Sequence, residues 1–110
     1  MPLLERTRVE VYLPDVPSSE YQSLLRLLQT EFTYAFGGVS VINGLEGTYL
    51  SASGERIPDR INLLYSDVPL ALSTDFAIVA AYVRELKRAA MAELSEEVVL
   101  ISVEQVYHEI

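Results

Sequence analysis

The chain has 110 residues, half of them apolar, and its 16 acidic and 8 basic side chains give a net charge of −8 at pH 7. This length is typical of one domain with a modest core, and the negative charge argues against binding to nucleic acid or to an anionic membrane because like charges repel. The chain has no cysteine, which excludes disulfides, thiolate nucleophiles and cysteine-ligated metal sites.

The N-terminal stretch MPLLERTRVEV does not have the basic start and long apolar run of a leader peptide. No later stretch reaches the roughly 18 consecutive apolar residues that a membrane-spanning helix needs. We therefore expect a cytoplasmic protein without a membrane partner, folded as one domain over residues 1–110.

The first predicted elements are a strand and a helix. Residues 8–13 alternate apolar and polar side chains, which is typical of a half-buried strand. A helix is then predicted to begin at Ser19, because Ser19 and Gln22 have the spacing of a capping box. The helix ends at Gly37-Gly38, since glycine adopts the left-handed cap conformation at little cost. Its apolar residues recur at helical spacing: Tyr21, Leu24, Leu25, Leu28, Phe32 and Phe36.

A second helix of about 20 residues is predicted after a loop that spans residues 67–73. Thr74 is the expected N-cap residue, and Asp75 suits the positive end of the helix dipole. The chain then becomes rich in β-branched residues over 98–103, which predicts an inner strand with both faces covered, and turns more polar beyond Glu104. The apolar stripe of the second helix consists of Phe76, Val79, Val83, Leu86, Ala90 and Leu94.

The predicted order is therefore strand, helix, two strands, helix, strand. Right-handed crossovers would place both helices on one face of an antiparallel sheet. This is the α+β, split βαβ or ferredoxin-like arrangement. It predicts the strand order 4-1-3-2, with the first and third strands in the centre.

The two strands between the helices are expected to form a hairpin with one of two candidate turns. Asn43-Gly44 is a strong local turn signal. We prefer a turn at Ser53-Gly54, because only this turn gives the strand over 56–65 a long antiparallel partner.

This pairing sets Leu50 opposite Ile57, but the apolar residues of the second strand change face between Leu45 and Leu50. One extra residue in that strand would correct the register, and glycine forms such a β-bulge most easily. Gly47 is the first choice for the bulge and Gly44 is the second.

A hairpin of this length would extend past the first strand and leave residues 46–60 as an arm. Pro58 fits an arm, because proline has no backbone donor for a neighbouring strand. Exposed strand edges are commonly covered by association, so we expect a homodimer or larger homo-oligomer made through the arm, the edge strands or the bare face of the sheet. The apolar candidates for that face are Tyr12, Tyr49, Leu64, Val106 and Ile110.

The search for chemistry is mostly negative. His108 is the only histidine and lies on a terminal strand, so it indicates a surface residue more than a catalytic or metal site. Arg56 and Arg60 are expected on one side of the third strand near Tyr49, where they would hold a small anion or pair with Glu46, Glu55 and Asp59. We predict no catalytic residue, metal site or cofactor.

A family resemblance adds to this interpretation. The strand VEVYLP, a helix ending in FxxxFGG, the segment VSVINGLEGTYLSASGE and the strand INLLY are similar to those of a family of small bacterial one-domain proteins without an assigned activity. The architecture also resembles two ferredoxin-like groups, namely dimeric small-molecule sensor domains and dimeric α+β-barrel oxygenases or isomerases. Fold alone confers neither function.

We therefore expect a non-catalytic small-molecule-binding or assembly module that works as a homo-oligomer. The alternative is a cofactor-free, dimeric α+β-barrel enzyme of the oxygenase or isomerase type. A closed pocket with convergent polar groups would favour the enzyme. The candidate ligand or interface residues are Tyr12, Tyr49, Arg56, Arg60 and His108.

Overall fold

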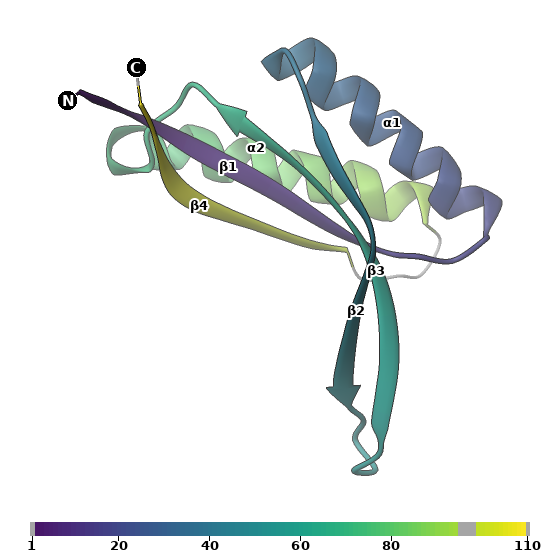
Figure 1. Cartoon of the computed structure of the whole chain (residues 1–110). Coiled ribbons are helices and arrows are strands. Elements are labelled where there is room, and N and C mark those ends of the chain that lie inside the picture. The colour runs from purple at the N-terminus through teal and green to yellow at the C-terminus, as the bar shows by residue number, and fades with distance from the viewer. Residues whose placement is uncertain (1, 95–98, 110) are drawn as a thin grey trace.

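A computed structural model describes residues 2–94 and 99–109 of the chain. Three strands and one helix lie in the first part and are followed by a longer helix and a last strand (Figure 1). In chain order the elements are β1 (Leu3–Pro14), α1 (Ser19–Phe36), β2 (Ser40–Leu50), β3 (Arg56–Val68), α2 (Leu72–Glu93) and β4 (Leu100–Glu109).

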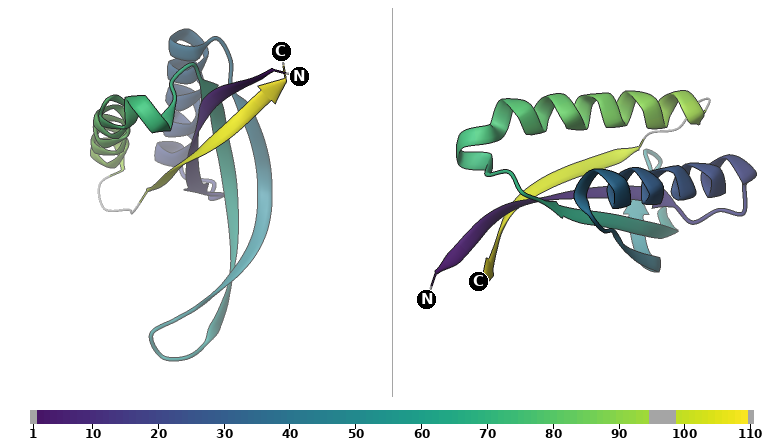
Figure 2. Two further views of the ribbon diagram at one scale, coloured as in Figure 1. Left: turned by 90° about the vertical axis from the view of Figure 1, so that its left-hand side faces the viewer. Right: turned by 90° about the horizontal axis from the view of Figure 1, so that it is seen from above.

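The four strands form one sheet in the order β2-β3-β1-β4, and every neighbouring pair is antiparallel. Both helices lie on the same side of this sheet (Figure 2). The predicted α+β ferredoxin-like fold with strand order 4-1-3-2 is therefore confirmed.

The core lies between the helices and the sheet, and strand alternation explains its composition. In β1 the odd-numbered residues from Thr7 to Leu13 are buried, whereas their even-numbered neighbours are half-buried. The predicted stripes of both helices supply the other layer, with one exception. Phe76 is 64% exposed, because it lies beside Ile101 and Val103 at the edge of the sheet, where no further strand covers it.

The helix α1 begins at Ser19 and ends before Gly37, as predicted, but the capping at its start differs from the prediction. Gly37 has a φ of +87°, and its N–H donates to the Thr33 carbonyl at 2.9 Å, so the predicted left-handed cap is confirmed. At the start, the N-cap is Ser18, whose hydroxyl accepts the Glu20 N–H at 3.2 Å. The predicted capping box is wrong, since the Gln22 amide donates instead to the Val16 carbonyl at 3.3 Å.

The second helix begins earlier than the sequence predicted. Its N-cap position is Ala71, not Thr74. Asp75 has a non-helical backbone (φ −110°, ψ 20°), and its carboxylate accepts the Ala71 N–H at 2.9 Å. Asp75 thus satisfies a free donor at the start of α2 from a position inside the element, which a simple capping pattern does not anticipate.

The hairpin turns where it was predicted to turn. The Gly54 N–H donates to the Ser51 carbonyl at 3.0 Å, and Gly54 has a φ of +86°, which favours glycine. The strand register next to the turn differs from the prediction by one residue, because Leu50 pairs with Arg56 rather than with Ile57.

The predicted β-bulge exists, but at the second-choice position. Ile42 pairs with Leu63 and Leu45 pairs with Ile61, so β2 contains one residue more than β3 over this interval. Gly44 lies within the bulge at a φ of +67°. The first choice, Gly47, was wrong, since it pairs regularly with Asp59.

Two expectations about the faces of the strands were also wrong. Leu64 is fully buried beneath the helices, because the even-numbered residues of β3 face them. The strand predicted as an inner strand over 98–103 lies at the edge of the sheet, and its described part leaves Leu100 exposed. Val98 and Ile110 lie outside the described residues.

Candidate functional site

The face of the sheet that the helices do not cover, called here the open face, carries two of the four ion pairs among the described residues, Arg8 with Asp67 and His108 with Asp67. Its apolar margin is Ile42, Leu45 and Leu100, all exposed. These lie beside Leu63, Ile61 and Tyr12, respectively, in the strand register. The open face consists of Arg6, Arg8, Glu10 and Tyr12 of β1, Ile61, Leu63, Tyr65 and Asp67 of β3, Ser102, Glu104, Val106 and His108 of β4, and this margin.

A chain of charges joins three strands at one end of the open face. The Arg8 guanidinium donates to both carboxylate oxygens of Asp67, at 2.7 and 3.0 Å. The Nε2 atom of His108 lies 2.8 Å from Asp67 Oδ2, and the Tyr65 ring centre lies 4.6 Å from the Arg8 guanidinium carbon. Hydrogen bonding from Arg8 and His108 lowers the pKa of Asp67, and Asp67 raises the pKa of Arg8.

A second cluster lies further along the same face. The Tyr12 hydroxyl donates to Glu10 Oε2 at 3.1 Å. Burial raises the pKa of Glu10, and the charge of Glu104 adds to this rise while the Tyr12 hydrogen bond opposes it. Burial and Glu10 also raise the pKa of Tyr12. The pair therefore presents a phenol that stays neutral and a carboxyl that keeps its proton to a higher pH than an exposed glutamate.

Polar side chains at the base of the arm explain the position of the bulge. The Gly44 N–H donates to the buried Asn62 Oδ1 at 3.0 Å, and Asn62 Nδ2 donates to Asp15 Oδ1 at 3.3 Å. A Cβ atom on Gly44 would lie 2.7 Å from the Arg60 guanidinium. The bulge therefore forms where a buried amide can accept the freed donor and where only glycine leaves room for arginine.

The arm, residues 46–60, projects away from the body of the molecule and contributes to a longest dimension of 48 Å (Figure 1). Thr48 pairs with Pro58 and Tyr49 with Ile57. Because side chains alternate along a strand, Arg56 and Arg60 lie on one face of the arm and Tyr49 on the other. The structure therefore does not bring the three predicted anion-binding residues together.

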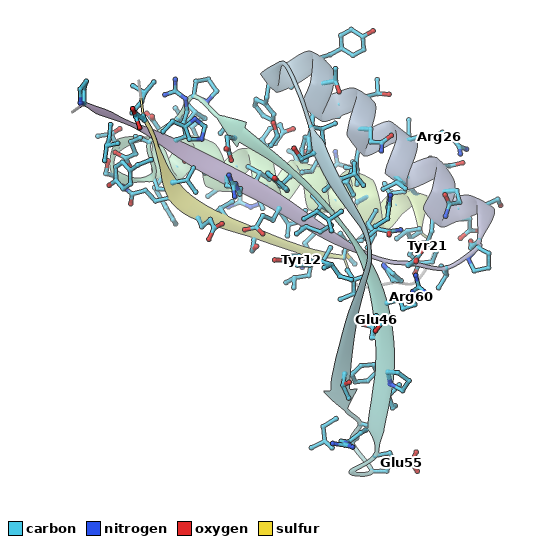
Figure 3. The ribbon with its side chains drawn as sticks, in the orientation of Figure 1. Tyr12, Tyr21, Arg26, Glu46, Glu55 and Arg60 are labelled. Atoms are coloured by element: carbon cyan, nitrogen blue, oxygen red, sulfur yellow. The ribbon has the colours of Figure 1, made fainter. Side chains whose placement is uncertain are left out.

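Arg60 instead lies at the base of the arm, where its Nε atom is 3.6 Å from Asp15 Oδ2. Figure 3 shows Arg60 and Glu46 near this base and Glu55 at the tip, with Tyr12 on the sheet. The predicted candidates thus fall into two groups: Tyr12 and His108 on the open face, and the remaining three on the arm.

The sequence did not indicate which side chains contact these candidate residues. Arg8 and Asp67 are directly opposite in the β1-β3 register, and Glu10 lies two residues from Tyr12. The register of β1 and β3, which brings Arg8 beside Asp67, has no signal in the sequence. Asn62 lies inside the run INLLY, whose odd-numbered residues are all apolar, so the alternation did not indicate that Asn62 points into the core.

Two other kinds of site are not found in the described part of the chain. Across residues 2–94 and 99–109, no three histidine, cysteine, aspartate or glutamate side chains are grouped so as to hold a metal ion. No helix within these ranges combines the length and apolar character needed to cross a membrane.

Comparisons with known proteins identify the fold. Scans of the sequence against family models and curated proteins find no match. Among solved structures, CPII, a nitrogen regulatory PII-like protein of Thiomonas intermedia bound to ADP, AMP and bicarbonate, is similar with a TM-score of 0.59 and 11% identity, covering 99% of this chain and 100% of that one. CutA1 of Oryza sativa gives a TM-score of 0.60 and 16% identity, covering 97% and 84%.

A phage SAM lyase in complex with S-methyl-5′-thioadenosine is also similar, with a TM-score of 0.57, 12% identity and coverage of 96% of this chain and 88% of that one. At such low identity these similarities concern the backbone arrangement alone. The chain therefore shares its ferredoxin-like fold with PII-like and CutA1 proteins.

Proposed function

We propose that this chain is a non-catalytic module that binds a small molecule and works as a homo-oligomer assembled through the open face. The observation that carries this proposal is the composition of that face. Its apolar margin is exposed in a single chain, while Arg8, Asp67 and His108 on the same face are bonded to one another.

This composition suits a covered surface. A contact over the open face would bury Ile42, Leu45 and Leu100, whose exposed apolar area favours association. Burying an unpaired charge costs about several kcal/mol per ion, because the ion loses its hydration. Asp67 avoids much of that cost, because Arg8 and His108 already bond its carboxylate.

The ligand class is suggested by two of the similar structures. CPII holds ADP and AMP, and the phage lyase holds S-methyl-5′-thioadenosine, so both bind adenosine compounds. We therefore propose an adenosine-containing small molecule. On this chain we take Arg60 as the candidate phosphate contact, because its side chain is 62% exposed and its ion pair with Asp15 is long, at 3.6 Å.

Assembly is tested by light scattering on the purified chain at micromolar concentration. We expect a mass that is a multiple of 12.3 kDa, and Leu100→Lys should reduce it by placing a charge at the apolar margin. Tyr34→Lys is the matched control, since Tyr34 is exposed on α1, away from the sheet. A monomer at this concentration would refute the assembly.

Binding is tested by thermal denaturation with AMP, ADP, adenosine and S-methyl-5′-thioadenosine. A ligand at 100 times its dissociation constant stabilises the folded state by about 2.7 kcal/mol. Arg60→Gln should weaken the binding of AMP more than the binding of adenosine, because AMP has a phosphate and adenosine does not. If none of the four compounds shifts the melting temperature, the ligand class is wrong.

One observation favours an enzyme as the second candidate. Glu10, whose pKa is raised by burial, accepts a hydrogen bond from the Tyr12 phenol, and such a pair can act in acid-base catalysis. The similar phage protein is a lyase. Incubation of the protein with SAM tests this alternative. If the protein consumes SAM and Glu10→Gln does not, the enzyme is supported. If SAM is not consumed at any protein concentration, the enzyme is refuted and the binding module is retained.

A further inference from the structure

The two helices leave a groove between them on the side of the molecule opposite the open face. Its volume is about 560 Å³, which falls within the range of small-molecule sites. The floor of the groove is apolar and belongs to the core: Leu24 and Leu28 of α1, and Leu86 and Ala90 of α2. Leu27 is exposed at the side and extends this apolar surface.

The rim of the groove is acidic. Glu31 comes from α1, and Glu85 and Glu93 come from α2. The only cation of the lining is Arg88, and its guanidinium is held by Glu85 at 2.7 Å. Arg26, in an adjoining hollow that Glu93 also lines, donates to the Ser23 hydroxyl at 3.3 Å. In the part of the chain that the structure describes, Glu31 and Glu93 have no ion-pair partner.

Tyr82 fixes one of these carboxylates in place. Its hydroxyl donates to Glu31 Oε1 at 3.0 Å, and its ring packs edge-on against Phe36 with ring centres 5.3 Å apart. Burial and the Glu31 charge raise the pKa of Tyr82, so the phenol remains a neutral donor. The Tyr82 hydrogen bond therefore holds the Glu31 carboxylate beside the apolar floor, with its second oxygen able to accept a further hydrogen bond.

From this geometry we infer that the groove between α1 and α2 binds a small organic cation, an amine with an apolar body. The apolar body would cover the leucine floor, and the ammonium group would meet Glu31 and Glu93 at the rim. An anion of the same shape is disfavoured, since it would face three carboxylates and one guanidinium that is already paired. This site differs from the proposed adenosine site in location and in the sign of the ligand charge.

The test uses two probes with the same apolar body and opposite charge, 4-phenylbutylamine and 4-phenylbutyrate. Each is titrated into the isotope-labelled protein, and the amide signals are followed by NMR. We expect saturable shifts from the amine, confined to α1 and α2 residues that line the groove, and much weaker shifts from the acid. Equal binding of both probes, or no saturable amine binding at millimolar concentration, would overturn the inference.

Variants separate the role of the charge from that of the fold. Glu31→Gln and Glu93→Gln should each weaken amine binding about two- to fivefold, the value expected for one exposed charge contact. The matched control is Glu46→Gln on the arm, which removes the same charge far from the groove and should leave the affinity unchanged. If all three variants weaken the amine equally, net charge rather than the groove would account for binding. These outcomes are independent of the adenosine and assembly tests.

Discussion

The two faces of the sheet are built on different principles. Beneath the helices, apolar side chains form the buried core. The three buried polar residues in the described part of the chain each have a hydrogen-bond partner: Thr7 donates to the Leu70 carbonyl, Ser66 to the Gly38 carbonyl, and Asn62 to Asp15. On the open face, Arg8, Asp67 and His108 bond to one another across three strands. Hydrophobic burial therefore determines the first face, whereas pairwise electrostatics determine the second.

The largest effect is expected on the covered face. Phe32 is fully buried and packs beside Phe36, so Phe32→Ala should destabilise the fold by about 3–5 kcal/mol through lost burial and the resulting cavity. Chemical denaturation measures this loss. Tyr34→Ala is the control on the same helix, and a comparable loss there would contradict the contrast between buried and exposed positions.

The next effect concerns the junction between the body and the arm. Gly44→Ala should cost about 1–3 kcal/mol, because a side chain at this positive φ is strained and would also displace the Arg60 guanidinium. Gly47→Ala should change stability by less than about 0.5 kcal/mol, since no atom lies near the added methyl group. Equal losses in denaturant would argue that the bulge is not at Gly44.

On the open face, Asp67→Asn should cost about 1–2 kcal/mol at pH 7, because a bidentate bond to a charged group is lost. The pKa of Asp67 is lowered in the folded state, so its contribution exists above the unfolded pKa and disappears as pH falls through the folded pKa. The difference between the two proteins should therefore shrink below about pH 4. A pH-independent difference would contradict a contribution from the ionised carboxylate.

The smallest expected effect is a gain in stability, from a substitution of Glu10. Because the pKa of Glu10 is raised in the folded state, its contribution to stability is full below the unfolded pKa and is lost as pH rises through the folded pKa. Glu10→Gln mimics the protonated form and should stabilise the fold at pH 7 by less than about 1 kcal/mol. Melting curves from pH 4 to pH 8 should show the gain growing with pH, and a loss at neutral pH would refute this account.

The sequence was informative where periodicity alone decides the structure. The stripes of both helices and the alternation of β1 predict the covered face, and the long hairpin follows from the glycine at position 54. The open face could not be predicted in the same way. Whether Arg8 meets Asp67 depends on the register of strands about 60 residues apart in the chain, and propensity rules do not contain this information.

The position of the bulge also depends on contacts that the local sequence does not indicate. The apolar pattern of the second strand favours Gly47, because it puts the change of face between Leu45 and Leu50. The choice depends on the buried Asn62 amide, which accepts the Gly44 N–H, and on the space that Arg60 occupies. The N-terminal end of α2 was missed for a related reason, because Asp75 bonds back to Ala71 from within the helix.

The extra residue in β2 also changes whether the odd-numbered or the even-numbered side chains face the helices. Before it, the odd-numbered Val41 faces the helices with Leu64, and beyond it the odd-numbered Leu45 and Tyr49 face the opposite side. Deleting Asn43 or Gly44 would remove the bulge and leave one residue opposite Asn62, so Leu45 would still pair with Ile61 and the outer side chains would keep their faces. Because the surplus residue is absorbed at Asn43 and Gly44, every residue of the outer β2 segment has its regular partner on β3, and the arm continues the sheet despite the unequal residue count of the two strands.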